Sequence, residues 1–140
     1  MNASLEQPQE LRALEHRVDA LRVLLDQLQD LSDRLHGLLE ARKRGNGRMQ
    51  VPVDIGMGFC AEGVVENTDR IIVAAGLDDL FFDLPVEQAQ DFVRKRVVIV
   101  EKTLQGLEGL ITRLKEDHAK LVKTLKSAFG GQTGQISTVS

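Results

Sequence analysis

The stretch VDIGMGFCAEGVVENTDRIIVAAG, residues 53–76, decides the fold of this 140-residue chain. On both sides of it, apolar residues recur with the spacing of helices, but here that period stops and glycines and β-branched residues take over. The region 50–84 around it holds four short runs with β propensity, separated by turn residues such as Gly56, Gly58 and Asn67. Two β-hairpins are therefore predicted.

The predicted strands carry apolar residues on both faces. Ile71 and Val73 point one way, while Ile72 and Ala74 point the other way. A hairpin with one face in water would carry polar residues on that face, and two isolated hairpins are marginally stable in water. The sequence therefore predicts that hairpins from several chains join into a shared sheet or barrel, which also closes their unpaired edges.

Leucines before the hairpins follow a heptad repeat. With Leu11 at position a, every a and d position up to Leu39 is apolar except Ser32. This pattern predicts a coiled-coil helix over residues 8–44, which ends where three basic residues meet Gly45.

The helical period resumes over residues 86–129, where His118 is the single polar residue of the apolar seam. Because neither helix can bury its stripe alone, the two are expected to form an antiparallel pair. The glycine-rich segment 130–140 is predicted to be a disordered tail. The expected fold is α+β and mostly α: one domain, residues 1–140, with a long antiparallel helical coiled-coil hairpin and two β-hairpins at the helix-helix junction.

Composition and motifs exclude several functions. One cysteine, no apparent signal peptide and no apolar run of about 20 residues favour a reduced compartment, the cytoplasm or also the nucleus. A net charge of -3 with both signs interspersed favours neither nucleic acid nor membrane as a partner. The pair Asp78-Asp79 is explained by a turn, Gly56-Met57-Gly58 precedes a strand rather than a helix, and Cys60 is expected to be a buried strand cysteine. We therefore predict no catalytic residue, cofactor or metal.

Three stretches carry a family resemblance: VPVDIGMGF (51–59), VVENTDRIIVAAG (64–76) and FFDLPVEQAQDFVRKR (81–96). Together with the order helix, two hairpins, helix, they resemble the alpha-type subunits of the prefoldin family over residues 10–129. Gly76 and Ala89 stand where that family has a glycine before the last strand and an alanine early in the second helix. Within the family, the middle segment is most similar to the prefoldin-like ubiquitously expressed transcript branch.

The resemblance implies an ATP-independent co-chaperone subunit. It would join beta-type prefoldin subunits in a hetero-hexamer, hold unfolded clients such as actin or tubulin, and pass them to the cytosolic chaperonin. The prefoldin-like branch implies an alternative, an adaptor that works with an unconventional prefoldin interactor and RuvB-like ATPases in complex maturation and transcription regulation. The composition alone also permits a homo-oligomeric coiled-coil scaffold.

The resemblance also implies two sets of site residues. Subunit assembly would be carried by Ile55, Phe59, Val64, Ile71, Val73, Phe81 and Phe82. Clients would be bound at the tip of the coiled-coil arm by Leu5, Leu11, Leu14, Leu121, Leu125 and Phe129. The tip leucines at seam positions have an alternative role, which is to hold the two helices together, whereas Leu5 and Phe129 lie off the seam and are better candidates for contact.

Overall fold

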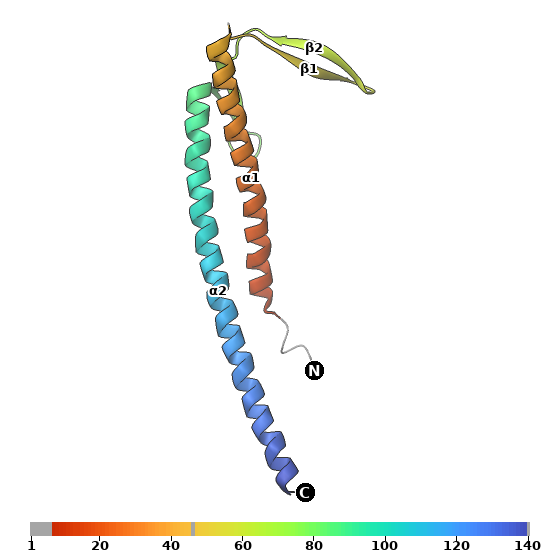
Figure 1. Ribbon diagram of the computed structural model, residues 1–140, viewed down its shortest axis with the longest axis vertical. Helices are drawn as coiled ribbons and strands as arrows, with labels where there is room; N and C mark the ends of the chain where they lie inside the picture. Colours follow the sequence, from red (N-terminus) through yellow and green to blue (C-terminus); the bar gives the residue numbers. More distant parts are fainter. Residues whose placement is uncertain (1–6, 46, 140) are drawn as a thin grey trace. The chain divides into compact units, whose positions relative to one another are not determined.

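The computed structural model describes residues 7–45 and 47–139, with side chains up to residue 130. Helix α1 comes first and helix α2 last, with four strands between them (Figure 1). The elements are α1 (Gln9–Arg44), β1 (Met49–Gly56), β2 (Phe59–Val65), β3 (Arg70–Ala74), β4 (Phe81–Pro85) and α2 (Val86–Val139). This confirms the predicted fold class, because two long helices enclose two antiparallel β-hairpins.

The two helices differ in how well their ends were predicted. Helix α1 ends at Arg44, as expected, after a last turn of three basic residues. Helix α2 continues to Val139, whereas the sequence predicts a helix up to residue 129 and a disordered tail over 130–140. Each glycine there costs about 1 kcal/mol of helix propensity relative to alanine, but residues 130–140 contain no proline that would block the helix.

The chain divides into two compact units. The first is made of Met1–Leu24 and Val100–Ser140, and the second is Leu25–Ile99. In the first unit, α1 and α2 run antiparallel, because Glu15 pairs with Lys115 while Arg22, further along α1, pairs with Glu108. Its core is the predicted heptad seam, and its members are Leu11, Val18 and Ile111, with Leu14, Leu104, Leu107 and Leu114 packed against them.

The second unit has a core shared by helices and strands. Leu35 of α1 packs with Val86, Ala89 and Val93 of α2, and Val73 of β3 joins them. Partly buried residues surround this cluster: Leu28, Leu31, Leu38, Leu39, Ile71, Leu84, Phe92 and Val97. The second hairpin is therefore part of the hydrophobic core of its own chain.

Each hairpin forms a separate two-stranded sheet in the described part of the chain. In the first hairpin Val51 lies opposite Gly63 and Val53 opposite Ala61. In the second hairpin Ile71 lies opposite Leu84. Because directly paired residues project to the same side of an antiparallel sheet, these registers determine which side chains share a face.

Candidate assembly and client-binding surfaces

One face of the β1–β2 hairpin is entirely apolar. The register places together on it Met49, Val51, Val53, Phe59, Ala61, Gly63 and Val65. The opposite face carries Gln50, Pro52, Asp54, Cys60, Glu62 and Val64. The prediction of strands that are apolar on both faces is therefore wrong for this hairpin, since four of its six outer positions are neither aliphatic nor aromatic.

The apolar face is open to solvent in the isolated chain. The side chain of Phe59 is 68% exposed, and Met49 and Val53 are also exposed. Gly63 makes room on this face, because a Cβ there would lie 2.6 Å from Cγ2 of Val53. Ile55 sits at the register shift between Asp54 and Gly56 and is exposed too. Burying these side chains against another protein would be favourable by roughly 1.5–3 kcal/mol for each large side chain.

The turn that closes this hairpin has an unusual backbone. Gly56, Met57 and Gly58 all have positive φ, with values of 100°, 54° and 79°. Glycine adopts such angles without strain, and the carboxylate of Asp54 accepts a hydrogen bond from the amide of Gly56 at 2.8 Å. Met57 is 98% exposed at the tip. The tight turn therefore presents a large apolar side chain to solvent.

The predicted assembly residues of the β3–β4 hairpin lie on two different faces, one packed on the helices and one exposed. Ile71 and Val73 face the chain's own helices, and the ring of Phe82 meets that of Phe92 edge-on at a centroid distance of 6.0 Å. On the outer face, Phe81 is exposed and Ile72 is 71% exposed. Among the seven predicted residues, the ones that another chain could reach most directly are Ile55, Phe59, Val64 and Phe81.

Ile72 was not among the predicted assembly residues. Its alternation with Ile71 and Val73 already indicated that it lies on the opposite face of the strand. An apolar groove of about 340 Å³ adds to the accessible apolar surface of the second unit. It is lined by Leu31, Leu35, Leu38, Ala41, Met49 and Ile71, with Arg34 and Gly37.

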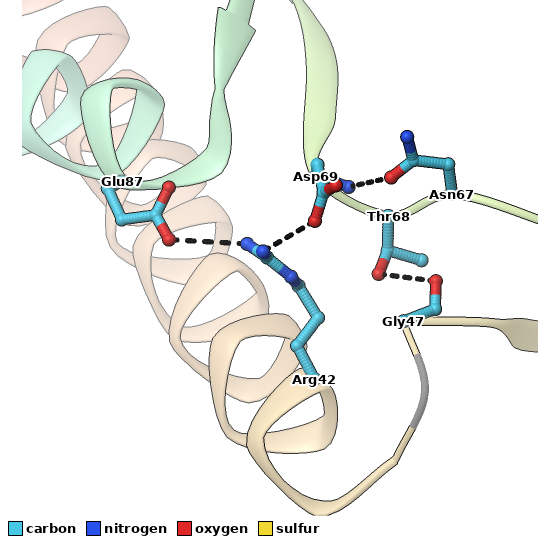
Figure 2. Close-up of polar contacts among 6 residues, drawn as sticks. All are labelled: Arg42, Gly47, Asn67, Thr68, Asp69 and Glu87. Atoms are coloured by element: carbon cyan, nitrogen blue, oxygen red, sulfur yellow. Dashed lines mark hydrogen bonds and ion pairs between the residues drawn. The ribbon is translucent and has the colours of Figure 1, made fainter.

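Arg42 of α1 forms ion pairs with the β2–β3 connection and with α2 (Figure 2). Its guanidinium lies 2.5 Å from a carboxylate oxygen of Asp69 and 3.2 Å from one of Glu87. The amide of Asp69 donates a hydrogen bond to the side-chain oxygen of Asn67, and the amide of Val86 donates one to the carbonyl of Asp69. The β2–β3 connection is therefore tied to the end of α1 and the start of α2.

The predicted client-binding residues have different environments. Leu11 is only 2% exposed and Leu14 packs against the same cluster, so both belong to the helix-helix core. Leu121 is 58% exposed, and Leu125 and Phe129 are also exposed. Leu5 lies outside the described residues. The alternative role, holding the two helices together, therefore fits Leu11 and Leu14, while the α2 residues offer exposed surface.

Two ion pairs join the helices in the first unit. Lys115 donates a hydrogen bond to Glu15 at 2.7 Å, which lowers the pKa of Glu15. Arg22 donates one to Glu108, which raises the pKa of Arg22. All four side chains are at least one third exposed, so solvent screens the attraction. These charges select the antiparallel register more than they add stability.

The described residues show no group of three or more side chains suited to hold a metal ion. Within the same residues, no helix is long and apolar enough to cross a membrane. Cys60 is a free, exposed cysteine, contrary to the expectation of a buried one, because it projects from the polar face of the first hairpin opposite Asp54.

The arrangement defines a class of protein: a helical coiled-coil hairpin with two β-hairpins between its helices. The sequence profile described as Prefoldin subunit matches residues 8–129. The cryo-EM structure of filamentous PFD from Methanocaldococcus jannaschii is similar in fold, with a TM-score of 0.57 and 20% sequence identity over 89% of this chain and 99% of that one. Among curated proteins, none matches the sequence significantly. The chain belongs to the prefoldin family, a family of chaperones that are not enzymes.

Proposed function

We propose that this chain is an alpha-type subunit of a hetero-oligomeric co-chaperone, which assembles through its β-hairpins and holds unfolded proteins with its coiled-coil arm without using ATP. One observation carries the proposal: the β1–β2 hairpin exposes a continuous apolar face, while the β3–β4 hairpin is already built into the chain's own core. An exposed apolar face on a two-stranded sheet calls for a protein partner.

The partners we propose are beta-type prefoldin subunits in a hetero-hexamer. Hairpins of several chains would cover the apolar face that contains Phe59 and the outer face that contains Ile72 and Phe81. The clients would be unfolded proteins of the actin and tubulin kind, passed on to the cytosolic chaperonin. The proposed location is the cytoplasm, and no nucleic acid or membrane takes part.

A second candidate function is supported by the motif in the middle of the chain. The pattern from VDIG through VVENTDRIIVAAG, followed by Phe81-Phe82, resembles the prefoldin-like ubiquitously expressed transcript protein. In that role the chain would be an adaptor that works with an unconventional prefoldin interactor and RuvB-like ATPases, in the nucleus as well as the cytoplasm. Purification of the native complex separates the candidates: co-purifying chaperonin supports the first, and co-purifying RuvB-like ATPases support the second.

The assembly proposal is tested with two substitutions on the first hairpin. Phe59→Asp places a charge on its apolar face, and Gln50→Asp places the same charge on its polar face. After co-expression with beta-type subunits, sedimentation velocity should show the complex with Gln50→Asp and free subunits with Phe59→Asp. Both variants should keep the far-ultraviolet circular dichroism of the two helices. Normal assembly of Phe59→Asp would overturn the proposal.

The holding function needs a separate assay. The assembled complex should suppress aggregation of a chemically unfolded protein to the same extent with and without ATP. Suppression that requires nucleotide, or none at all, would contradict the proposed function even if assembly occurs.

A further inference from the structure

The end of the described arm contains a helix segment with two distinct faces. This basic segment of α2, residues 118–130, carries exposed apolar side chains at Leu121 and Leu125, four residues apart and therefore on one face. The rest of its circumference includes Lys120, Lys123 and Lys126. It contains no Asp or Glu, although the chain as a whole has a net charge of -3.

The paired part of the same helix shows what such a face binds. There, Ile111 and Leu114 of α2 pack with leucines of α1, and Lys115 forms an ion pair with Glu15 at 2.7 Å. The sequence beyond Lys115 repeats this pattern of apolar stripe and lysines. Among the described residues, however, α1 begins at Gln9, and every α2 residue from Lys123 to Gly130 is exposed.

From this geometry we infer that residues 118–130 are a docking face for an amphipathic helical segment of another protein, with an apolar stripe flanked by Asp and Glu. The bound segment would pack against residues 118–130 of α2 in the way that the start of α1 packs against Ile111 and Leu114. It would bury Leu121 and Leu125, and its carboxylates would pair with the lysines. A second copy of this face is disfavoured, because its lysines would repel those of the first. The inference deepens the proposed holding function and rests on it, since it specifies which client segments the arm prefers.

The test measures binding of two labelled synthetic peptides to the full chain by fluorescence anisotropy. Both peptides carry the same leucine heptads, one with glutamates and the other with lysines at the flanking positions. The glutamate peptide should bind about tenfold more tightly, as expected for three exposed ion pairs. The preference should shrink as ionic strength rises.

Three variants make the test specific. Lys120→Glu, Lys123→Glu and Lys126→Glu combined should reverse the preference between the peptides. Leu121→Ser with Leu125→Ser should weaken both peptides. A matched control reverses three exposed lysines elsewhere, Lys43, Lys95 and Lys102, and should leave both affinities unchanged.

Two results would overturn the inference. One is equal binding of the two peptides by the full chain. The other is binding of the chain to phosphatidylserine vesicles, lost in the triple lysine variant, with no binding of either peptide, which would make the face a lipid-binding surface. If the chain suppresses aggregation but shows no peptide preference, the inference fails and the proposed function stands. If it binds the glutamate peptide but protects no unfolded protein, the docking face stands and the proposed function fails.

Discussion

The carbonyl oxygen of Gly47 accepts two hydrogen bonds from Thr68, one from its hydroxyl at 2.8 Å (Figure 2) and one from its amide at 3.0 Å. Gly47 precedes β1 and Thr68 follows β2, so this contact closes the base of the first hairpin. Thr68 is only 5% exposed, although most of the hairpin it closes is exposed. The hairpin is therefore fixed at its base and open along its apolar face.

Replacing Thr68 tests this clamp. Thr68→Val keeps the shape and the amide hydrogen bond but removes the hydroxyl, and should lower the free energy of unfolding by about 1 kcal/mol. Thr68→Ser keeps the hydroxyl and serves as the control. Denaturant unfolding measures the difference, and a loss in Thr68→Ser with none in Thr68→Val would show that packing of the methyl group, rather than the hydroxyl, holds the base.

Arg42→Lys should loosen the connection between the hairpins and the helices. An ammonium group cannot reproduce the planar guanidinium that meets Asp69 and Glu87 together. Because both carboxylates are largely exposed, we expect a loss of only about 1 kcal/mol. Thermal unfolding measures it, with Arg44→Lys in the same helical turn as the control. A loss as large for Arg44→Lys would contradict the role given to Arg42.

Gly63→Ala should destabilise the first hairpin. The new methyl group would lie 2.6 Å from Cγ2 of Val53 and 3.4 Å from the carbonyl oxygen of Val51. The expected overpacking cost of about 1–3 kcal/mol exceeds the roughly 0.5–1 kcal/mol that alanine gains over glycine in a strand. Amide hydrogen exchange of β1 and β2 should become faster. Adding Val53→Ala should restore the protection, and failure to do so would place the clash elsewhere.

The Glu15–Lys115 pair predicts that the stability of the fold falls at acid pH. Because the folded pKa of Glu15 lies below its unfolded value, its contribution to stability is fully present above the ordinary glutamate pKa of about 4.3 and is lost as pH falls through the lowered folded value. An NMR titration of the Glu15 carboxyl carbon should show this, and Lys115→Met should move the midpoint upward. Lys102→Met is the control, and an unchanged midpoint in Lys115→Met would refute the assignment.

The sequence predicted those parts of the fold that depend on local periodicity. The heptad that includes Leu11 and Val18 is the core of the first unit, and turn residues such as Gly56 and Gly58 correctly marked the hairpins. The predicted end of the second helix at residue 129 rests on the glycines that follow it, and glycines weaken a helix without ending it.

The division of the hairpins into covered and open faces could not be predicted in the same way. Ile71 and Ile72 are identical in chemistry, and only their pairing with Leu84 and Asp83 shows that one packs on helices while the other meets solvent. The face on which Val64 lies is likewise shown only by its register, because this apolar residue stands among polar neighbours. Register is a long-range property, and it was not fixed by the alternation of apolar residues because both faces of β3 are apolar.

The two unlike faces of the β1–β2 hairpin also give assembly a direction. A neighbour that approaches the side of Phe59 can displace water from a continuous apolar surface, whereas one that approaches from the other side meets the carboxylates of Asp54 and Glu62. Losing the hydration of these charges opposes contact on that side. Contact with another chain is therefore favoured on one side of this hairpin and opposed on the other.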